Sequence, residues 1–170
     1  MLLEDILFNS LATLLGVVIG IPVALWIDRK TRKSAQREKA EAVLSALKEE
    51  INHNVDLLKQ IQEELKPDIM ITYNLDMNTW RATSLQEFEG IISHELLRKI
   101  FRIYYEFEHM SRKIDTQFNM HYSVVRATNV YLQEREKVVD SILSHASILE
   151  KEGKELVKEI EAELKKLSKN

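Results

Sequence analysis

The sequence predicts an all-α protein in which one N-terminal transmembrane helix continues into a cytoplasmic antiparallel bundle of three or four helices. Three observations predict it. The chain of 170 residues has only four glycines and two prolines, the residues that usually make tight turns. An uncharged run extends from Ile6 to Ile27, and apolar residues beyond it recur at heptad spacing. These features favour long helices with few connections.

The first expected element is a transmembrane helix over residues 1–28. Ile6 to Ile27 is a run of 22 uncharged residues, about 33 Å of helix, which matches the hydrocarbon thickness of a bilayer. A buried core helix rarely stays apolar on every face over this length. A cleaved signal peptide would carry positive charge before the run, where this chain has Glu4 and Asp5.

A basic juxtamembrane segment over residues 29–39 comes next. Its cations are Arg29, Lys30, Arg32, Lys33, Arg37 and Lys39. By the positive-inside rule they predict a single-pass inner-membrane protein with its N-terminus outside and its C-terminal domain in the cytoplasm. We expect the first four cations to contact anionic lipid headgroups, each contributing about 1 kcal/mol. Their position beside the membrane argues for lipid over nucleic acid.

Small residues form a stripe on the predicted transmembrane helix. Ala12, Gly16, Gly20 and Ala24 recur at every fourth position and so share one face. Small side chains let two helix backbones approach closely, so this face is predicted to be an oligomer interface. Asn9 and Thr13 have the same spacing and are candidate pore-lining residues. The alternative for Asn9 is a polar side chain reaching toward the outer interface.

Residues 40–170 are predicted to form the helical bundle, and the first bundle helix is expected to reach about Leu65. Its heptad seam consists of Leu44, Leu47, Ile51, Leu58, Ile61 and Leu65. Asn54 occupies the remaining seam position. This amide either fixes register or oligomeric state, or it hydrogen-bonds to a neighbouring helix or loop within one subunit.

An irregular connection follows, because Pro67 disfavours helical geometry at the residue before it. In this connection we expect Asp76 to cap a short turn, and Trp80 and Phe88 to pack into the bundle. Ser84 and Glu87 have capping-box spacing.

Ser93 starts a strongly amphipathic helix, with a turn or kink predicted at 119–123. A further helix follows, and Gly153 precedes the last helix or its extension. The apolar positions of these later stretches are Leu97, Ile100, Tyr104, Phe107, Ile114, Phe118, Leu132, Val139, Ile142, Ala146, Leu149, Leu156, Ile160, Leu164 and Leu167.

Two pairs, Glu50 with His53 and Glu106 with His109, have the Glu-x-x-His spacing of di-iron helical bundles. With 27 acidic residues and five histidines, about one such pair is expected by chance, so no metal site and no cofactor are predicted. The chain has no cysteine, which excludes thiolate metal sites.

Arg102 and His109 are the candidate catalytic residues. They resemble the Arg-x(4–6)-His motif of the higher-eukaryote-and-prokaryote nucleotide-binding ribonucleases, which have an all-helical domain. The resemblance implies that His109 acts as acid or base and that Arg102 holds phosphate. Ile103 stands where that family usually has a polar residue. The alternative is a solvated helix face on which Glu106 bridges the two charges.

The layout as a whole resembles the accessory membrane proteins of type VI-B CRISPR systems. It combines one N-terminal membrane helix, a basic segment and a helical domain with Arg102 and His109. The resemblance implies a ring of subunits around a membrane pore. The layout is also similar to a broader group of single-pass helical-bundle proteins of prokaryotes.

These observations predict a non-enzymatic single-pass membrane protein that oligomerises through its transmembrane helix and its helical domain, with a pore or effector assembly as one outcome. The alternatives are a membrane-tethered binding or sensing module and a membrane-anchored ribonuclease. The expected partners are membrane lipids, further copies of the chain and a protein partner; nucleic acid is not expected.

Overall fold

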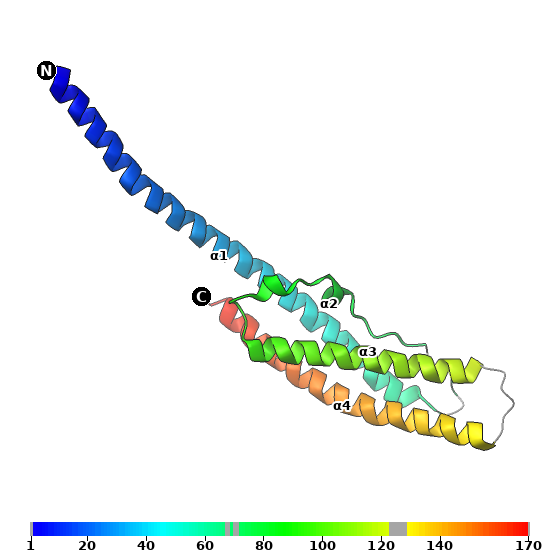
Figure 1. Ribbon diagram of the computed structural model, residues 1–170. Helices are drawn as coiled ribbons and strands as arrows, with labels where there is room; N and C mark the ends of the chain where they lie inside the picture. Colours follow the sequence, from blue (N-terminus) through cyan, green and yellow to red (C-terminus); the bar gives the residue numbers. More distant parts are fainter. Residues whose placement is uncertain (1, 67–68, 70–71, 123–128, 170) are drawn as a thin grey trace. The chain divides into compact units, whose positions relative to one another are not determined.

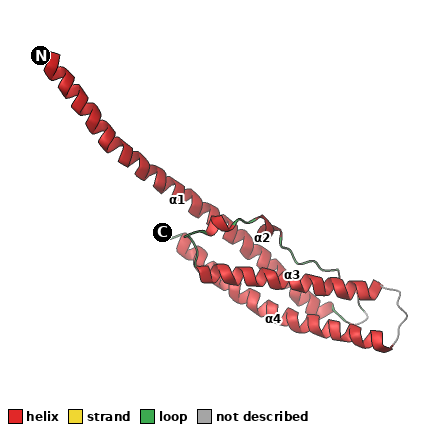
Figure 2. Cartoon of the chain, in the orientation of Figure 1, coloured by secondary structure: helices red, strands yellow, loops and turns green. Residues whose placement is uncertain are grey.

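The computed structural model describes residues 2–66, 69, 72–122 and 129–169, with side chains described for 16–66, 69, 72–120 and 133–169. All regular structure in this part of the chain is helical (Figure 2). The elements are α1 (Leu2–Glu64), α2 (Asn78–Ala82), the 3₁₀ helix η1 (Leu85–Phe88), α3 (His94–Tyr122) and α4 (Asn129–Leu167). The predicted all-α helical bundle is therefore confirmed.

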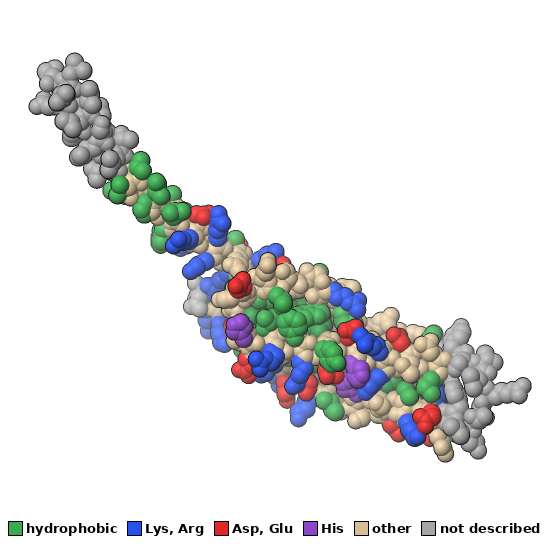
Figure 3. All heavy atoms as spheres, in the orientation of Figure 1, with side chains coloured by type: hydrophobic (Ala, Val, Ile, Leu, Met, Phe, Trp, Pro, Cys, Tyr) green, Lys and Arg blue, Asp and Glu red, His purple; other side chains and the backbone are tan. Residues whose placement is uncertain are grey.

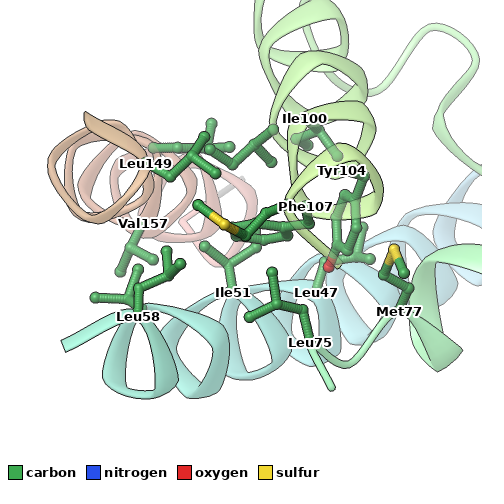
Figure 4. Close-up of a cluster of buried hydrophobic side chains, with 14 of the residues drawn as sticks. Leu47, Ile51, Leu58, Leu75, Met77, Ile100, Tyr104, Phe107, Leu149 and Val157 are labelled. Atoms are coloured by element: carbon green, nitrogen blue, oxygen red, sulfur yellow. The ribbon is translucent and has the colours of Figure 1, made fainter. Parts of the chain in front are cut away.

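The chain divides into two compact units, Met1–Lys39 and Ala40–Asn170, and α1 contributes to both. In the second unit, α1, α3 and α4 pack around one apolar core (Figures 1 and 4). The predicted seam of α1 is confirmed, since its six apolar members are at most 4% exposed. The α3 and α4 helices contribute fully buried side chains to this core, among them Tyr104, Phe107 and Ile142.

The helix directions differ from a simple up-and-down bundle. The α4 helix is antiparallel to α1, because Gln62 bonds Glu150 while Lys48 lies near Glu161. The α3 and α1 helices run in the same direction (Figure 1). The long connection from Leu65 to Ser93 makes this possible, since it returns along the bundle before α3 begins.

Asn54 holds this long connection to α1. Its buried amide donates to the carbonyl oxygen of Asp76 at 2.6 Å and accepts from the N–H of Asp76 at 2.7 Å. Both backbone hydrogen-bonding groups of Asp76, which is half-buried, are thus satisfied. Of the two predicted roles of Asn54, a bond to a loop within one subunit is the one that the structure shows.

Glu50 acts on the same connection. Its buried carboxylate accepts hydrogen bonds from the N–H groups of Thr79 and Trp80, at 2.6 and 3.2 Å, and from the hydroxyl of Tyr104 at 2.7 Å. The two N–H groups belong to the first turn of α2, which lacks a side-chain cap of its own. Trp80 then stacks on Tyr104 with 4.8 Å between ring centroids. As expected, Phe88 is buried, whereas Trp80 is half-buried.

The side-chain caps at the starts of the helices agree with the predictions in part. The Asp76 side chain accepts from the N–H of Asn78 at 3.0 Å, and Ser93 Oγ accepts from the N–H of Leu96 at 3.2 Å, at the start of α3. Ser84 makes no side-chain cap bond. The α3 helix continues through residue 122, so no turn begins at residue 119, and residues 123–128 lie outside the described chain.

Gly153 lies inside α4, which is one helix from residue 129 to 167. A Cβ at this position would lie 2.6 Å from Cγ2 of Val55 and 3.8 Å from Cγ2 of Ile51. The glycine therefore marks a close approach of α4 to α1 and does not interrupt the helix. This confirms the alternative that the last stretch is an extension of the preceding helix.

The predicted transmembrane helix is wrong for the described chain, in which no helix combines the length and apolar character needed to cross a bilayer. The apolar stretch with described side chains extends from Gly16 to Ile27 and ends at Asp28. The single-pass inner-membrane localisation, with the N-terminus outside and the C-terminal domain in the cytoplasm, is wrong for the same reason.

Candidate functional site

The polar face shared by α3 and α4 contains most of the residues that are candidates for a functional site. The two helices are antiparallel, so residues of rising number on α3 meet residues of falling number on α4. Lys99 pairs with Glu159, Arg102 with Glu152, and Glu106 with His145. The spacing of three to four residues on α3 places these side chains on one helical face.

Glu106, His109 and His145 form a compact group, which we call the His–Glu cluster. Glu106 Oε2 lies 3.0 Å from His145 Nε2 and 4.0 Å from His109 Nδ1. One ligand atom of each residue lies within 4.8 Å of the other two. The side chain of His145 is 15% exposed, that of Glu106 30% and that of His109 52%, so the cluster is reached from solvent on the His109 side.

Lys113 lies next to the cluster. Its Nζ is 3.4 Å from Nδ1 of His145 and 3.1 Å from Oγ of Ser141. Burial lowers the pKa of His145 and the positive charge of Lys113 lowers it further, whereas Glu106 opposes the shift. A lowered pKa favours the neutral imidazole, which has a lone pair available for a proton or a metal ion.

The two predicted catalytic residues lie on the same face of α3 but engage different groups. Arg102 Nη2 lies 2.8 Å from Glu152 Oε1, whereas His109 belongs to the His–Glu cluster. Two helical turns separate them, about 10 Å along the axis. A shallow pocket of about 140 Å³ beside Arg102 is smaller than typical small-molecule sites of roughly 300–1,000 Å³. The ribonuclease hypothesis stays a prediction.

His145 is the residue that the sequence interpretation missed. Glu106 and His109 were visible as an i, i+3 pair, but His145 is distant in sequence and has no motif around it. Because His145 lies in sequence between the buried Ile142 and Ala146, the pattern predicts only that its side chain lies beside the apolar face of α4. Identifying the third member requires the register between α3 and α4.

The other Glu-x-x-His pair does not form a comparable group. Glu50 is buried and accepts three hydrogen bonds from α2 and Tyr104, whereas His53 is exposed. The carboxylate therefore has a structural role.

The predicted oligomer interface is described in part. Gly16 and Gly20 are exposed on α1, and a Cβ built on either meets no atom within 4 Å. Ala24 is also exposed. Asn9, Ala12 and Thr13 lie outside the residues whose side chains are described, so the pore-lining positions and one member of the stripe are not placed.

The predicted headgroup-binding cations are all exposed on α1: Arg29, Lys30, Arg32 and Lys33. Nζ of Lys30 lies 5.4 Å from the ring centroid of Trp26, and Arg32 pairs with Asp28 at 2.9 Å. These cations were predicted to contact lipid headgroups because they follow the predicted transmembrane helix, so the headgroup contacts stay a prediction without that support.

Comparison with known proteins leaves the proposed resemblances untested. No protein-family model, curated protein or solved structure matches this chain.

Proposed function

We propose that the protein is a non-catalytic assembly protein, which associates with further copies of itself through the helical segment Gly16–Ile27. We call this segment the apolar segment. One observation carries the proposal: eight large hydrophobic side chains of the segment are between 48% and 64% exposed in the single chain. They are Val17, Val18, Ile19, Ile21, Val23, Leu25, Trp26 and Ile27.

The exposed side chains surround the helix. At about 100° per residue seven of them lie on the other sides of the helix, whereas Ile27 lies in line with the stripe of Gly16, Gly20 and Ala24. Figure 3 shows apolar side chains on the described start of α1, followed by basic ones. A helix that is apolar on all sides is normally buried, and exposed apolar surface of this kind marks an association site.

Further copies of the same segment are the occupants that suit this surface best. Covering a helix on several sides requires more than one neighbour, and copies supply helices of equal length and apolar character. Closed rotational symmetry brings identical surfaces together without leaving an open end. The glycines support close contact, because helix backbones approach where side chains are small.

The assembly state of the full chain tests the proposal. We expect sedimentation velocity in a mild detergent, which limits non-specific aggregation, to give a discrete oligomer. A Gly16→Leu/Gly20→Leu variant fills the stripe and should shift the distribution toward smaller species. Val18→Leu adds a leucine on another side of the helix and serves as the matched control, with the oligomer retained.

Two results would count against the proposal. A wild-type chain that stays monomeric at high protein concentration rules out self-association. An unchanged oligomer in the Gly16→Leu/Gly20→Leu variant rules out the stripe as the contact surface.

A further inference from the structure

The His–Glu cluster has the composition of a transition-metal site. Two imidazoles and one carboxylate are the protein ligands of one class of zinc site, in which water completes a tetrahedral coordination. In the cluster, Glu106 and His109 come from one turn of α3, and His145 comes from α4. We propose that Glu106, His109 and His145 bind one divalent first-row transition metal ion, for which Zn²⁺ is the best-suited probe.

The distances fit such an ion after a small adjustment. Bonds of about 2.0–2.1 Å in a tetrahedron place neighbouring ligand atoms about 3.3 Å apart. The distances from Glu106 Oε2 to the two imidazole nitrogens, 3.0 and 4.0 Å, lie on either side of this value. The widest separation in the cluster is at most 4.8 Å. His109 is half-exposed, so rotation of its side chain can close the remaining gap without repacking the core.

The cluster is open to solvent on the side of His109. His145 and Glu106 are held between the helices by their mutual contact, whereas His109 faces solvent. Water can therefore reach the ion and fill the open coordination position. The donor set of nitrogen and oxygen favours Zn²⁺ over Mg²⁺ and Ca²⁺, which prefer oxygen ligands.

Lys113 opposes metal binding, and this gives the proposal its sharpest test. When Nε2 of His145 coordinates a metal, Nδ1 carries the proton and needs an acceptor. Lys113 presents a cation to that nitrogen at 3.4 Å and has only protons to donate. On binding, its ammonium group must turn away toward Ser141. Lys113→Gln removes the charge and supplies an amide oxygen that can accept a hydrogen bond from the Nδ1–H group of His145.

Isothermal titration of the untagged full chain with Zn²⁺, and with Co²⁺ as a spectroscopic probe, tests the site. We expect one ion per chain and a Co²⁺ absorption band typical of tetrahedral coordination. His109→Ala and His145→Ala should each weaken binding by at least about tenfold. His109→Ala is the safer variant for folding because its side chain is half-exposed. Lys113→Gln should bind more tightly than the wild type.

His53→Ala is the matched control, because His53 belongs to the other Glu-x-x-His pair and is exposed. Its affinity for Zn²⁺ should equal that of the wild type. Absence of stoichiometric binding would overturn the proposal. So would unchanged affinity in both His109→Ala and His145→Ala with folding retained by circular dichroism. A Lys113→Gln variant that binds more weakly would also contradict it. These outcomes are independent of the assembly state.

Discussion

Gly153→Ala tests the packing of α4 on α1. A Cβ at position 153 would lie 2.6 Å from Cγ2 of Val55, whereas carbon atoms in contact are normally about 3.5–4.0 Å apart. About 1 Å of movement is therefore required. Val55 is only 3% exposed and β-branched, so its side chain cannot rotate away cheaply.

Two opposing effects set the size of the change. Replacing a mid-helix glycine by alanine stabilises a helix by about 1 kcal/mol. Overpacking a well-packed core costs about 1–3 kcal/mol. We expect the clash to dominate, with a net destabilisation of about 1–2 kcal/mol. With a urea dependence of about 2 kcal/mol per molar, the midpoint of the unfolding transition should fall by roughly half to one molar.

Equilibrium urea denaturation followed by circular dichroism measures this change. The Gly153→Ala/Val55→Ala double variant removes the clashing methyl group, so the two single effects should couple favourably by about 1 kcal/mol or more. Ser147→Ala lies on the exposed side of α4 and should be neutral or slightly stabilising. A Gly153→Ala protein more stable than the wild type would refute the close approach of the two helices.

Three further predictions concern the long connection, acid stability and catalysis. Asn54→Ala leaves the half-buried N–H and carbonyl groups of Asp76 without this partner and should destabilise the fold by about 1–3 kcal/mol in urea denaturation; a loss below about 0.5 kcal/mol would show that the connection is not held there. Hydrogen bonds from Lys154 and Gln62 lower the pKa of Glu150, so its contribution to stability is complete above its ordinary pKa and is lost as pH falls through the lowered value. Glu150→Gln should therefore reduce the fall in Tm between about pH 5 and pH 3. The same fall in Tm in the variant and the wild type would contradict this. Because Arg102 is paired with Glu152, we expect no RNA cleavage by the full chain; cleavage that disappears in both Arg102→Ala and His109→Ala would restore the ribonuclease hypothesis.

The sequence predicts the apolar core of the bundle well, because its helices have a clear heptad or amphipathic period. The seam from Leu44 to Leu65 is buried as expected, and Ser93 caps α3. The same periodicity does not define helix direction. A long connection permits either direction, and only the contacts of Asn54 and Glu50 show that it returns along α1.

The candidate site was predictable only in part. Glu106 and His109 share a helical face by local geometry, which sequence spacing reveals. The pairing of His145 with Glu106 depends on the register between α3 and α4, which packing of the whole core decides. The same register gives Arg102 and His109 different partners on α4, Glu152 for Arg102 and His145 for His109.

The central claim is that copies of the chain meet at the stripe of the apolar segment, and single-cysteine crosslinking tests it most directly. The chain has no cysteine of its own, so Gly20→Cys introduces one reporter. Copies packed at the stripe bring two Cβ atoms within disulfide range, about 3.5–4.5 Å. Under mild oxidation, Gly20→Cys should form disulfide-linked dimers much faster than Val18→Cys, whose side chain lies on another side of the helix. Equal rates for the two variants, or no dimer with Gly20→Cys, would contradict the claim.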